Sequence, residues 1–595
     1  MNKYFFCFST GLLLTLSGGW AAGDEEKTPV NPPVQEETLP NQIGKWVQQL
    51  GDPSFLVRQR SEAFLIRTGL LAYPELQRAK LSNDLEIARR AESILNKIEL
   101  SFLNQEDQEI GFWIRQYMVG NDPVTQARII WLFADPFSDA AGGKGLPTLC
   151  RIARFDGNNA LRMEAVKALI ASPPELPQQR KRWYQHIQNA FQHTGNDEIL
   201  KTLVEFAEIR CAMEETEKKT GEEFQNKVRS VAEKTLNLLK MPESSLCPGS
   251  RIDILLHYAA AELQEYAGFT EDRDKTVAAA LAVKSVPVGS LEKQLVDLDD
   301  SLPMKEHFYA GRWLRQRYRL HWATSHFQLV IADGHVSLQS QACSQAADTA
   351  MLLADYPAAI GFIDKQIQIV GGQEYTRKFS DSAALIPALK RQKSYCEAKI
   401  AEEKEDWKEV HAKTAAYLEW AASNLPGPKP VPVTALTRQI INSNSSAMAA
   451  IVDDDWLILA YEANKMLPQA GDEYYVPRLQ QMLWHLWNVI YMSWQPHPLE
   501  VKCNRAAWLL AHTDGHYETA LAMVERALRV RTDDPSFLDT LAYVYFSAGK
   551  IDEAVQTQEK AVRFAPEVAV FRKALDQYRK EKEKEKEKEK TAGNK

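Results

Sequence analysis

The sequence predicts an all-α protein in which helical hairpins stack into an α-α superhelix, or solenoid. Long stretches place apolar residues at helical spacing, whereas alternating strand patterns are scarce. Glycine and proline number only 28 each and gather at the joints between these stretches. Near the C-terminus one pattern also repeats every 34 residues, which is typical of stacked two-helix units. The residues that repeat are Gly515 and Gly549, Ala520 and Ala554, and Ala527 and Ala561.

The composition is that of globular protein. Of the 595 residues, 45% are hydrophobic and 25% are charged, which is close to the average of soluble domains. A chain of this length can hold several domains. The formal net charge of -8 argues against nucleic-acid binding, which favours a basic domain.

The first 21 residues have the pattern of a cleaved export signal. Lys3 supplies a positive charge, residues 4–16 form an apolar core, and Gly19 and Ala21 are the small residues before a cleavage site. The core is shorter than the ~20 residues that a spanning helix needs. We therefore expect an exported protein, periplasmic or extracellular, that is cleaved near Ala21 and keeps no integral membrane span. Residues 22–40 are acidic and proline-rich, which predicts a disordered linker.

Residues 41–240 predict a first series of helices. Asp52 and Pro53 suit a helix start, and Leu56, Ala63 and Leu65 form a partial apolar stripe after them. Two further stripes are Ile87, Ala91, Ile94 and Leu95 after Asp84, and Arg162, Ala165 and Leu169 after a predicted cap near Asn158.

The order Asp, then Val or Ile with Arg, then Ala, then Leu resembles HEAT-like repeats. The likeness is clearest over 49–100 and fades by about Leu200. It implies a stack of antiparallel helix pairs and a role in holding partner molecules.

Residues 251–423 predict a second series of hairpins. Small residues let neighbouring helices approach, while larger apolar ones fill the space between them. Breaks at 241–250 and 424–432 flank this series, the second with four prolines in nine residues. We expect a linker at 424–448 and a helical segment at 449–500. The residues at hairpin spacing are Gly311, Leu314, Ala323 and Phe327, then Ala347, Ala350 and Ala359.

The last series, 501–579, looks like tetratricopeptide repeats. Leu541, Ala542, Tyr545, Ala554, Ala561 and Pro566 stand at the motif positions of one unit. The preceding unit keeps the small residues but has Trp508 where a small residue is expected and Thr532 where the proline belongs, and Gln558 replaces an aromatic of the second unit.

That resemblance implies two antiparallel helices per unit, stacked into a right-handed superhelix that binds peptides or proteins. It extends to the hairpins of 251–423. The stretch 538–554 looks like bacterial members of the family, and the whole chain resembles large exported bacterial repeat proteins.

The end of the chain predicts a capping helix and a tail. Val570, Phe571, Leu575 and Tyr578 form one apolar helix face that covers the last repeat. From Lys580 the chain alternates Lys and Glu, so residues three apart attract and residues four apart repel. We expect 580–595 to be a solvated charged tail.

No residue pattern predicts a catalytic, metal or cofactor site. Asp453, Asp454 and Asp455 precede a helical run and suit its N-terminus better than a cation, and His321, His326 and His335 fit no zinc spacing. The cysteines left after signal removal are widely spaced, which favours small buried side chains and leaves disulfides open.

The resemblance supplies the candidate site. In tetratricopeptide proteins, ligands lie against the first helix of each unit, on the concave side. Lys502 and Arg505 are expected to pair with a partner carboxylate, Arg505 through two parallel hydrogen bonds. The alternative is a solvated basic helix start. The positions carried over are Lys502, Arg505, Leu509 and His512 in one unit, and Asp539, Tyr543 and Phe546 in the next.

Two functions follow. The first is a non-catalytic scaffold that binds a protein or peptide partner in the concave groove. The second is a solenoid-type enzyme acting on cell-wall glycan, which needs two carboxyl groups that converge in a cleft, one with a raised pKa. A deep polar pocket with clustered ionisable groups would favour the enzyme.

Overall fold

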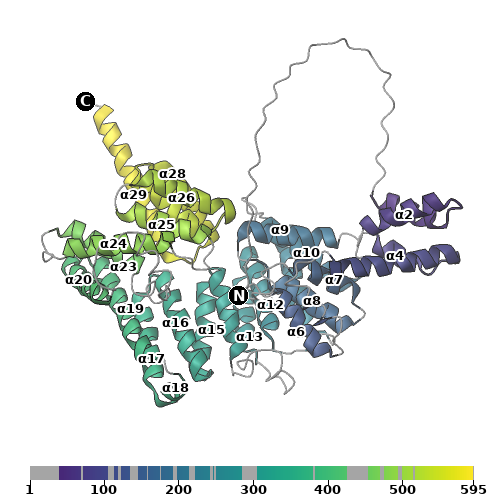
Figure 1. Ribbon diagram of the computed structural model, residues 1–595, viewed down its shortest axis with the longest axis horizontal. Coiled ribbons are helices and arrows are strands. Elements are labelled where there is room, and N and C mark those ends of the chain that lie inside the picture. The colour runs from purple at the N-terminus through teal and green to yellow at the C-terminus, as the bar shows by residue number, and fades with distance from the viewer. Residues whose placement is uncertain are drawn as a thin grey trace, which may run out of the picture. The chain divides into compact units, whose positions relative to one another are not determined.

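The regular structure of the described residues consists of 26 α-helices and two 3-10 helices, with no strand (Figure 1). Neighbouring helices pack as pairs, which confirms the predicted all-α fold of helical hairpins. The computed structural model describes residues 39–68, 72–104, 113–114, 116–117, 122–134, 145–156, 158–174, 176–191, 197–213, 221–241, 246, 249–284, 304–379, 382–424, 453–468, 475–492, 499–513 and 516–593.

The chain divides into two compact units, and the boundary follows Ser101. The sequence instead predicts one continuous series over 41–240. The predicted signal peptide and most of the linker lie outside the described residues.

The first unit contains three α-helices before a long fourth one. The predicted start of α2 is wrong. Asp52 and Pro53 were expected to begin the helix, but both precede it, and the helix begins at Phe55. Asp52 Oδ1 accepts a hydrogen bond from the Ser54 amide at 2.7 Å, so it orders the turn that leads into the helix. The elements are α1 (Leu39–Gln48), η1 (Gln49–Gly51), α2 (Phe55–Thr68), α3 (Tyr73–Ala79) and α4 (Leu85–Asn104).

The predicted stripe of α2 is only partly right. Leu65 is buried, but Leu56 is 63% exposed and Ala63 is exposed as well. Ser61 takes the core position instead, because its hydroxyl donates to the Val57 carbonyl at 2.8 Å and is thereby satisfied. The stripe of α4 is confirmed at Ala91, Ile94 and Leu95, all buried, and Asp84 Oδ1 caps that helix by accepting from the Glu86 amide at 2.9 Å.

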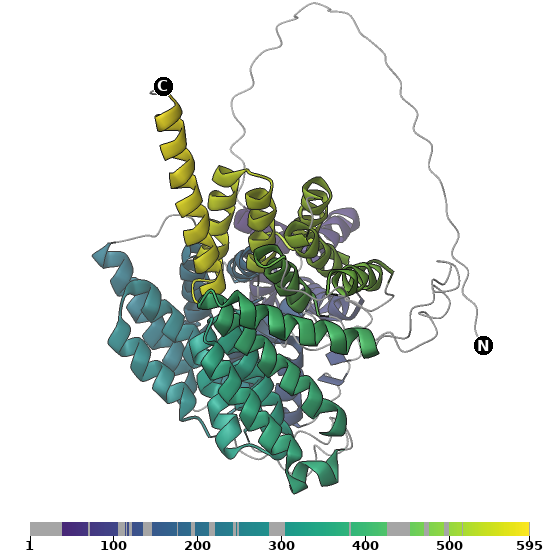
Figure 2. The same cartoon turned by 90° about the vertical axis from the view of Figure 1, so that its left-hand side faces the viewer.

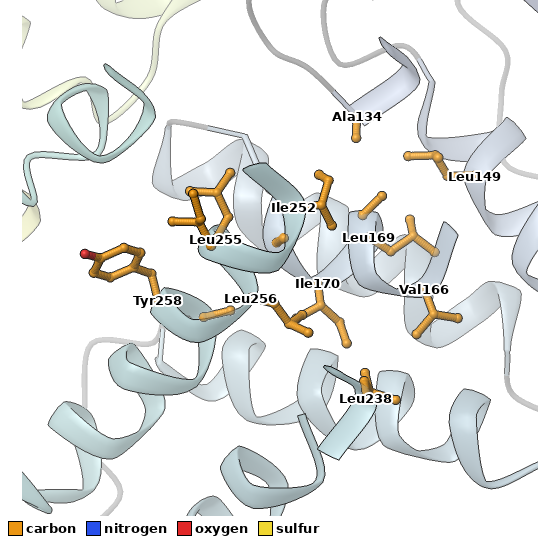
Figure 3. Packing of buried hydrophobic residues seen from close by; sticks show 14 of the residues in the cluster. Ala134, Leu149, Val166, Leu169, Ile170, Leu238, Ile252, Leu255, Leu256 and Tyr258 are labelled. Atoms are coloured by element: carbon orange, nitrogen blue, oxygen red, sulfur yellow. The ribbon is translucent and has the colours of Figure 1, made fainter. Parts of the chain in front are cut away.

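The second unit begins with a series of helices around the largest hydrophobic cluster of the described residues. Figure 3 shows part of it: Leu169 and Ile170 of α8 and Ile252 and Leu256 of α12 lie together among other apolar side chains. Asn158 caps α8 as predicted, accepting from the Ala160 amide at 2.9 Å. The elements are α6 (Pro123–Ala134), α7 (Leu146–Phe155), α8 (Asn159–Ala171), α9 (Pro177–Ala190), α10 (Glu198–Met213), α11 (Glu222–Asn237), η3 (Leu238–Lys240), α12 (Arg251–Ala267) and α13 (Thr270–Leu281).

The next helices lie side by side in sequence order (Figure 1). Gly311 confirms the predicted close approach, because a Cβ there would lie 2.7 Å from the ring of Phe327. The predicted small contacts Ala323, Ala347 and Ala359 are all fully buried. The elements are α14 (Lys305–Gln316), α15 (Leu320–Asp333), α16 (Val336–Leu352), α17 (Tyr356–Gly371), α18 (Gln373–Lys378), α19 (Ser382–Glu403) and α20 (Trp407–Asn424).

The C-terminal hairpins have the predicted small contacts. Ala520, Ala527, Ala554 and Ala561 are fully buried, and Gly549 turns the chain with φ of 74°. Gly515 lies outside the described residues. The elements are α23 (Asp454–Met466), α24 (Tyr475–Met492), α25 (Leu499–Thr513), α26 (Tyr517–Val530), α27 (Pro535–Ser547), α28 (Ile551–Phe564) and α29 (Ala569–Gly593).

The last helix is longer than predicted. Phe571, Leu575 and Tyr578 are buried against the preceding repeat, as expected for a cap. The predicted charged tail continues the helix as far as Gly593, and its side chains over 583–588 are exposed. One ion pair to the neighbouring helix, Lys582 Nζ to Asp552 Oδ1 at 2.5 Å, favours the helical form of the alternating segment.

The C-terminal hairpins pack back against the middle of the second unit. Leu320 of α15 shares a hydrophobic cluster with Leu538, Ala565 and Phe571. The His321 amide donates a hydrogen bond to Glu567 Oε2 at 2.9 Å. Figure 2 shows α29, in yellow, meeting the teal helices at this contact. The array therefore returns to its own middle.

Five cysteines are free of disulfides in the described part of the chain, and Cys247 lies outside it. Cys150, Cys343 and Cys396 are buried, as the sequence indicates for small core side chains. Among the described helices, none combines the length and the apolar character needed to cross a membrane.

Candidate functional site

A cavity of about 650 Å³ lies inside the returning array of the second unit. Its walls come chiefly from the first helix of successive pairs, namely α14, α16, α19, α23, α25 and α27, and α29 completes them. That is the side on which the tetratricopeptide resemblance places a ligand. The lining residues include Arg315, Asp348, Tyr356, Tyr395, Lys399, Glu402, Glu403, Asp455, Glu462, Trp508, His512, Asp539, Tyr543, Lys573 and Tyr578.

Three of the seven predicted site residues line this cavity. They are His512, Asp539 and Tyr543. Lys502 lines a separate cavity of about 420 Å³ between α25 and α26. Leu509 is buried at 3% exposure, so it has little surface to offer a ligand.

Arg505 and Phe546 lie apart from the cavity and are held by contacts within the chain. Arg505 makes the predicted two parallel hydrogen bonds, but Asp454 accepts both, at 2.6 Å and 2.8 Å. The ring of Phe546 stacks on Tyr578, with centroids 4.5 Å apart. The Arg505 guanidinium, which was expected to bind a carboxylate of a partner molecule, therefore binds Asp454 of the same chain.

The acidic run at 453–455 has three different uses. Asp453 caps α23 by accepting from the Asp455 amide at 3.0 Å, as the sequence favours. Asp454 pairs with Arg505. Asp455 turns to the cavity instead, a position that the sequence did not reveal.

Charge is unbalanced along the cavity wall. Six carboxyl groups line it, against three side chains that carry a fixed positive charge. Each cation already has a carboxylate: Arg315 pairs with Asp348, Lys399 with Glu402, and Lys573 with Glu403. Within the described residues, the carboxyl groups left without an ion pair are Asp455, Glu462 and Asp539.

The pKa values of these three carboxyl groups are raised, chiefly by burial. Burial raises the pKa of Asp455 to about 7, and the neighbouring Asp453 adds to the shift. Burial likewise raises the pKa of Glu462 to about 7, with Glu402 adding repulsion. The pKa of Asp539 also rises to about 7 through burial, although a hydrogen bond from Gln558 opposes it. The exposed surface of Asp455 lines the cavity, where the surrounding protein limits its hydration.

Aromatic rings form much of the remaining wall. His512 lies flat on Tyr543 with ring centroids 3.6 Å apart, and its Nδ1 donates to the Trp508 carbonyl at 2.9 Å. Burial lowers the pKa of His512 to about 3, so the ring is neutral near pH 7. Tyr578 and Tyr356 are only 2% and 6% exposed.

The departures from the repeat pattern help to build this site. Trp508, which stands where a small residue is expected, forms part of the wall. Gln558, which replaces an aromatic, is fully buried and donates to Asp539 Oδ1 at 2.6 Å and to the Phe571 carbonyl at 3.1 Å. These departures were a second sequence signal for the cavity, beside the predicted positions His512, Asp539 and Tyr543.

The arrangement can hold a positively charged or hydrogen-bonding group between carboxyls and rings. A metal is a poorer match, because the described residues contain no group of three or more His, Cys, Asp or Glu placed to hold an ion.

Comparisons with known proteins add little to this picture. No protein-family model matches the chain, and no curated protein is similar to it in sequence. A structure of a monomeric IFIT1 mutant with m7Gppp-AAAA is 13% identical, covers 88% of this chain and 100% of its own, and has a TM-score of 0.18. The APC/C hetero-tetramer Cut9-Hcn1 is 10% identical, with 80% and 98% covered and a TM-score of 0.15. At these TM-scores neither carries an argument about function.

Proposed function

We propose that the second unit is a protein-interaction module whose cavity holds a segment of a partner protein or peptide. The cavity itself carries the proposal. Its volume of about 650 Å³ falls within the ~300–1,000 Å³ of ligand pockets. Its lining from successive first helices suits an extended segment that runs along the inside of a superhelix.

We also propose that the chain acts outside the cytoplasm. The support is the pattern of Lys3, the apolar core at 4–16 and the small residues before position 22. Cleavage is tested by N-terminal sequencing of the protein recovered from the exported fraction of a bacterial host. The expected new N-terminus is Ala22 or its immediate neighbour, and an intact Met1 would contradict export by this signal.

Selection from a displayed library of random dodecapeptides tests the binding proposal on the full chain. Peptides enriched on the wild type should lose binding to Gln577→Trp, which places a large side chain at the cavity wall. Gln556→Trp is the matched control, since Gln556 is an exposed glutamine on α28 outside this wall. Enriched peptides that bind both variants equally would overturn the proposal.

The glycan-hydrolase alternative receives one specific observation, the raised pKa values of carboxyls in a common cavity. Asp455 and Glu462 are seven residues apart on α23, so their Cα atoms are separated by ~10.5 Å along the helix. Release of soluble muropeptides from peptidoglycan by wild type, abolished in Glu462→Gln, would favour the enzyme over the scaffold.

A further inference from the structure

We infer that the cavity recognises a lysine or arginine side chain of the partner segment. The cation would enter between Asp455, Glu462 and Asp539, with tyrosine rings beside it. This inference rests on the proposed function, since it names the chemistry of the segment that the cavity holds.

The first support is the balance of charge. Every fixed cation of the wall is paired with a carboxylate, as described above, and three carboxyls remain over. Two of them, Asp455 and Glu462, lie on one face of α23, and Asp539 comes from α27. Carboxylates attract a cation more strongly where the surrounding protein displaces part of the water, as it does around the half-buried Glu462 and Asp539.

The second support is independent of the carboxyls. Tyr578 and Tyr356 are more than nine-tenths buried, yet in the described part of the chain neither hydroxyl has a hydrogen-bond partner. The hydroxyl oxygens are not among the fully enclosed polar atoms, so each still reaches open space at the cavity wall. Both side chains line the cavity, so a ligand there can supply the missing partner.

The rings suit the same ligand. An ammonium or guanidinium group over a tyrosine or tryptophan face is attracted by the negative face of the ring. Tyr543, Tyr395 and Trp508 line the cavity, and His512 covers one face of the Tyr543 ring. An anionic ligand finds no equivalent, because each of the three fixed cations is already paired.

The test measures binding of fluorescein-labelled octapeptides to the full chain by anisotropy, at pH 8 and physiological salt. The probes are an alternating lysine–glycine peptide, its Nε-acetyllysine form, and the alternating glutamate–glycine peptide. The cavity variant is the triple Asp455→Asn, Glu462→Gln, Asp539→Asn. The control is the triple Glu233→Gln, Glu525→Gln, Glu553→Gln, which removes the same charge from exposed positions outside the wall.

The lysine peptide is expected to bind the wild type at least tenfold more tightly than the acetylated form, and the glutamate peptide not to bind. The cavity triple should weaken lysine-peptide binding at least tenfold, while the control triple changes it less than twofold. Equal losses in both triples would show a general charge effect and overturn the inference, as would equal binding of the acetylated peptide.

Two further outcomes distinguish failure of the cation inference from failure of the proposed peptide-binding function. Library peptides that need the cavity but carry no Lys or Arg would leave the proposed function standing and refute the cation. Displacement of the lysine peptide by free spermidine at lower concentration than by unlabelled peptide would replace the peptide ligand with a polyamine and equally refute it. Retention of the wild-type melting temperature by the cavity triple excludes misfolding as the cause of lost binding.

Discussion

Single residues of the second unit carry charge and hydrogen bonds deep inside it, and they are the positions most sensitive to substitution. Glu262 is 3% exposed and accepts from Arg210 at 2.6 Å and from Arg317 at 3.0 Å. Arg319 adds a third contact at 3.3 Å. The cluster of arginines holds the pKa of the Glu262 carboxyl far below its usual range although burial alone would raise it.

Glu262→Gln should therefore be strongly destabilising. Neutralising the buried carboxylate that these arginines share removes its charge from among them, at a cost of roughly 3–5 kcal/mol. Urea unfolding of the full chain measures the effect. Glu265→Gln is the control: Glu265 is also a partner of Arg319 but is 36% exposed, so a loss below ~1 kcal/mol is expected. Similar losses in the two variants would contradict the assignment.

A buried relay of side chains has a definite arrangement of protons. His307 Nε2 donates to the Val283 carbonyl at 2.8 Å, so its Nδ1 must accept from His326 Nδ1, also at 2.8 Å. His326 Nε2 is then left to accept from the Tyr258 hydroxyl at 2.7 Å. Both histidines are neutral in this arrangement, and burial lowers the pKa of His326 to about 3.

The relay predicts loss of stability in acid. The folded-state pKa of His326 lies below that of the unfolded chain, so its contribution is present above about pH 6.5 and is lost as the pH falls toward 3. Between pH 7 and 5 the loss is about 2 kcal/mol. It is measured as the pH slope of unfolding, which should be shallower in His326→Gln. Exposed His321→Gln is the control, and an unchanged slope in His326→Gln would contradict the prediction.

At the scale of helices, the packing of neighbouring helices depends on small residues at particular positions. Gly311 of α14 is needed because a Cβ would meet the Phe327 ring, whereas a Cβ added at Gly361 of α17 would meet nothing within 4 Å. Both are helical glycines; hairpin spacing singled out Gly311 in the sequence, and the structure identifies Phe327 as the side chain that requires it. The alternating Lys and Glu of α29 shows the same limit, since the helix gains an ion pair to α28 that local spacing does not reveal.

The two glycines predict opposite effects of one substitution. Gly311→Ala should lower stability by roughly 1–3 kcal/mol through overpacking against Phe327. Gly361→Ala should raise it by up to ~1 kcal/mol, because alanine favours the helix and meets no obstacle. Thermal unfolding followed by circular dichroism compares both with the wild type. Stabilisation by both substitutions would contradict the prediction, because it would show that the contact between Gly311 and Phe327 can accommodate a methyl group.

At the scale of the second unit, the closure of the array turns separate helices into one acidic, aromatic cavity. Its charge depends on pH, because the carboxyls without an ion pair have pKa values near 7. Protonation below pH 7 removes the negative charge that would hold a cation. The other titratable or charged groups of the wall are Arg315, Asp348, Tyr356, Tyr395, Lys399, Glu402, Glu403, His512, Tyr543, Lys573 and Tyr578.

Binding of the lysine–glycine peptide should therefore weaken as the pH falls from 8 to 6. A carboxyl with a pKa of about 7 loses roughly 90% of its ionised form over that range, so about tenfold weaker binding is expected for each carboxylate that contacts the cation. His512 stays neutral throughout, since its pKa is about 3. Anisotropy titrations at both pH values measure the change, and a flat profile in the wild type would contradict it. The cavity triple variant is the control and should show no such change.

The fold was largely accessible from the sequence because a hairpin is specified by neighbours. Apolar spacing, small residues such as Ala520 and Ala554, and caps such as Asn158 act over one or two turns of helix. They determined the all-α class, the positions of most hairpins and the capping role of α29. Where burial depended on a distant surface, as at Leu56 and Ala63, the prediction was wrong.

The site was decided by tertiary structure. Asp455 and Asp539 are 84 positions apart in the chain, and they share a wall because α25 packs against both α23 and α27. The same packing left Asp455 without a cation while Asp454 took Arg505. The sequence by itself determined helices and their pairing, since these follow local periodicity. Which carboxyl groups lack an ion-pair partner depends on contacts between helices that are distant in the sequence. Only the tertiary structure decided this.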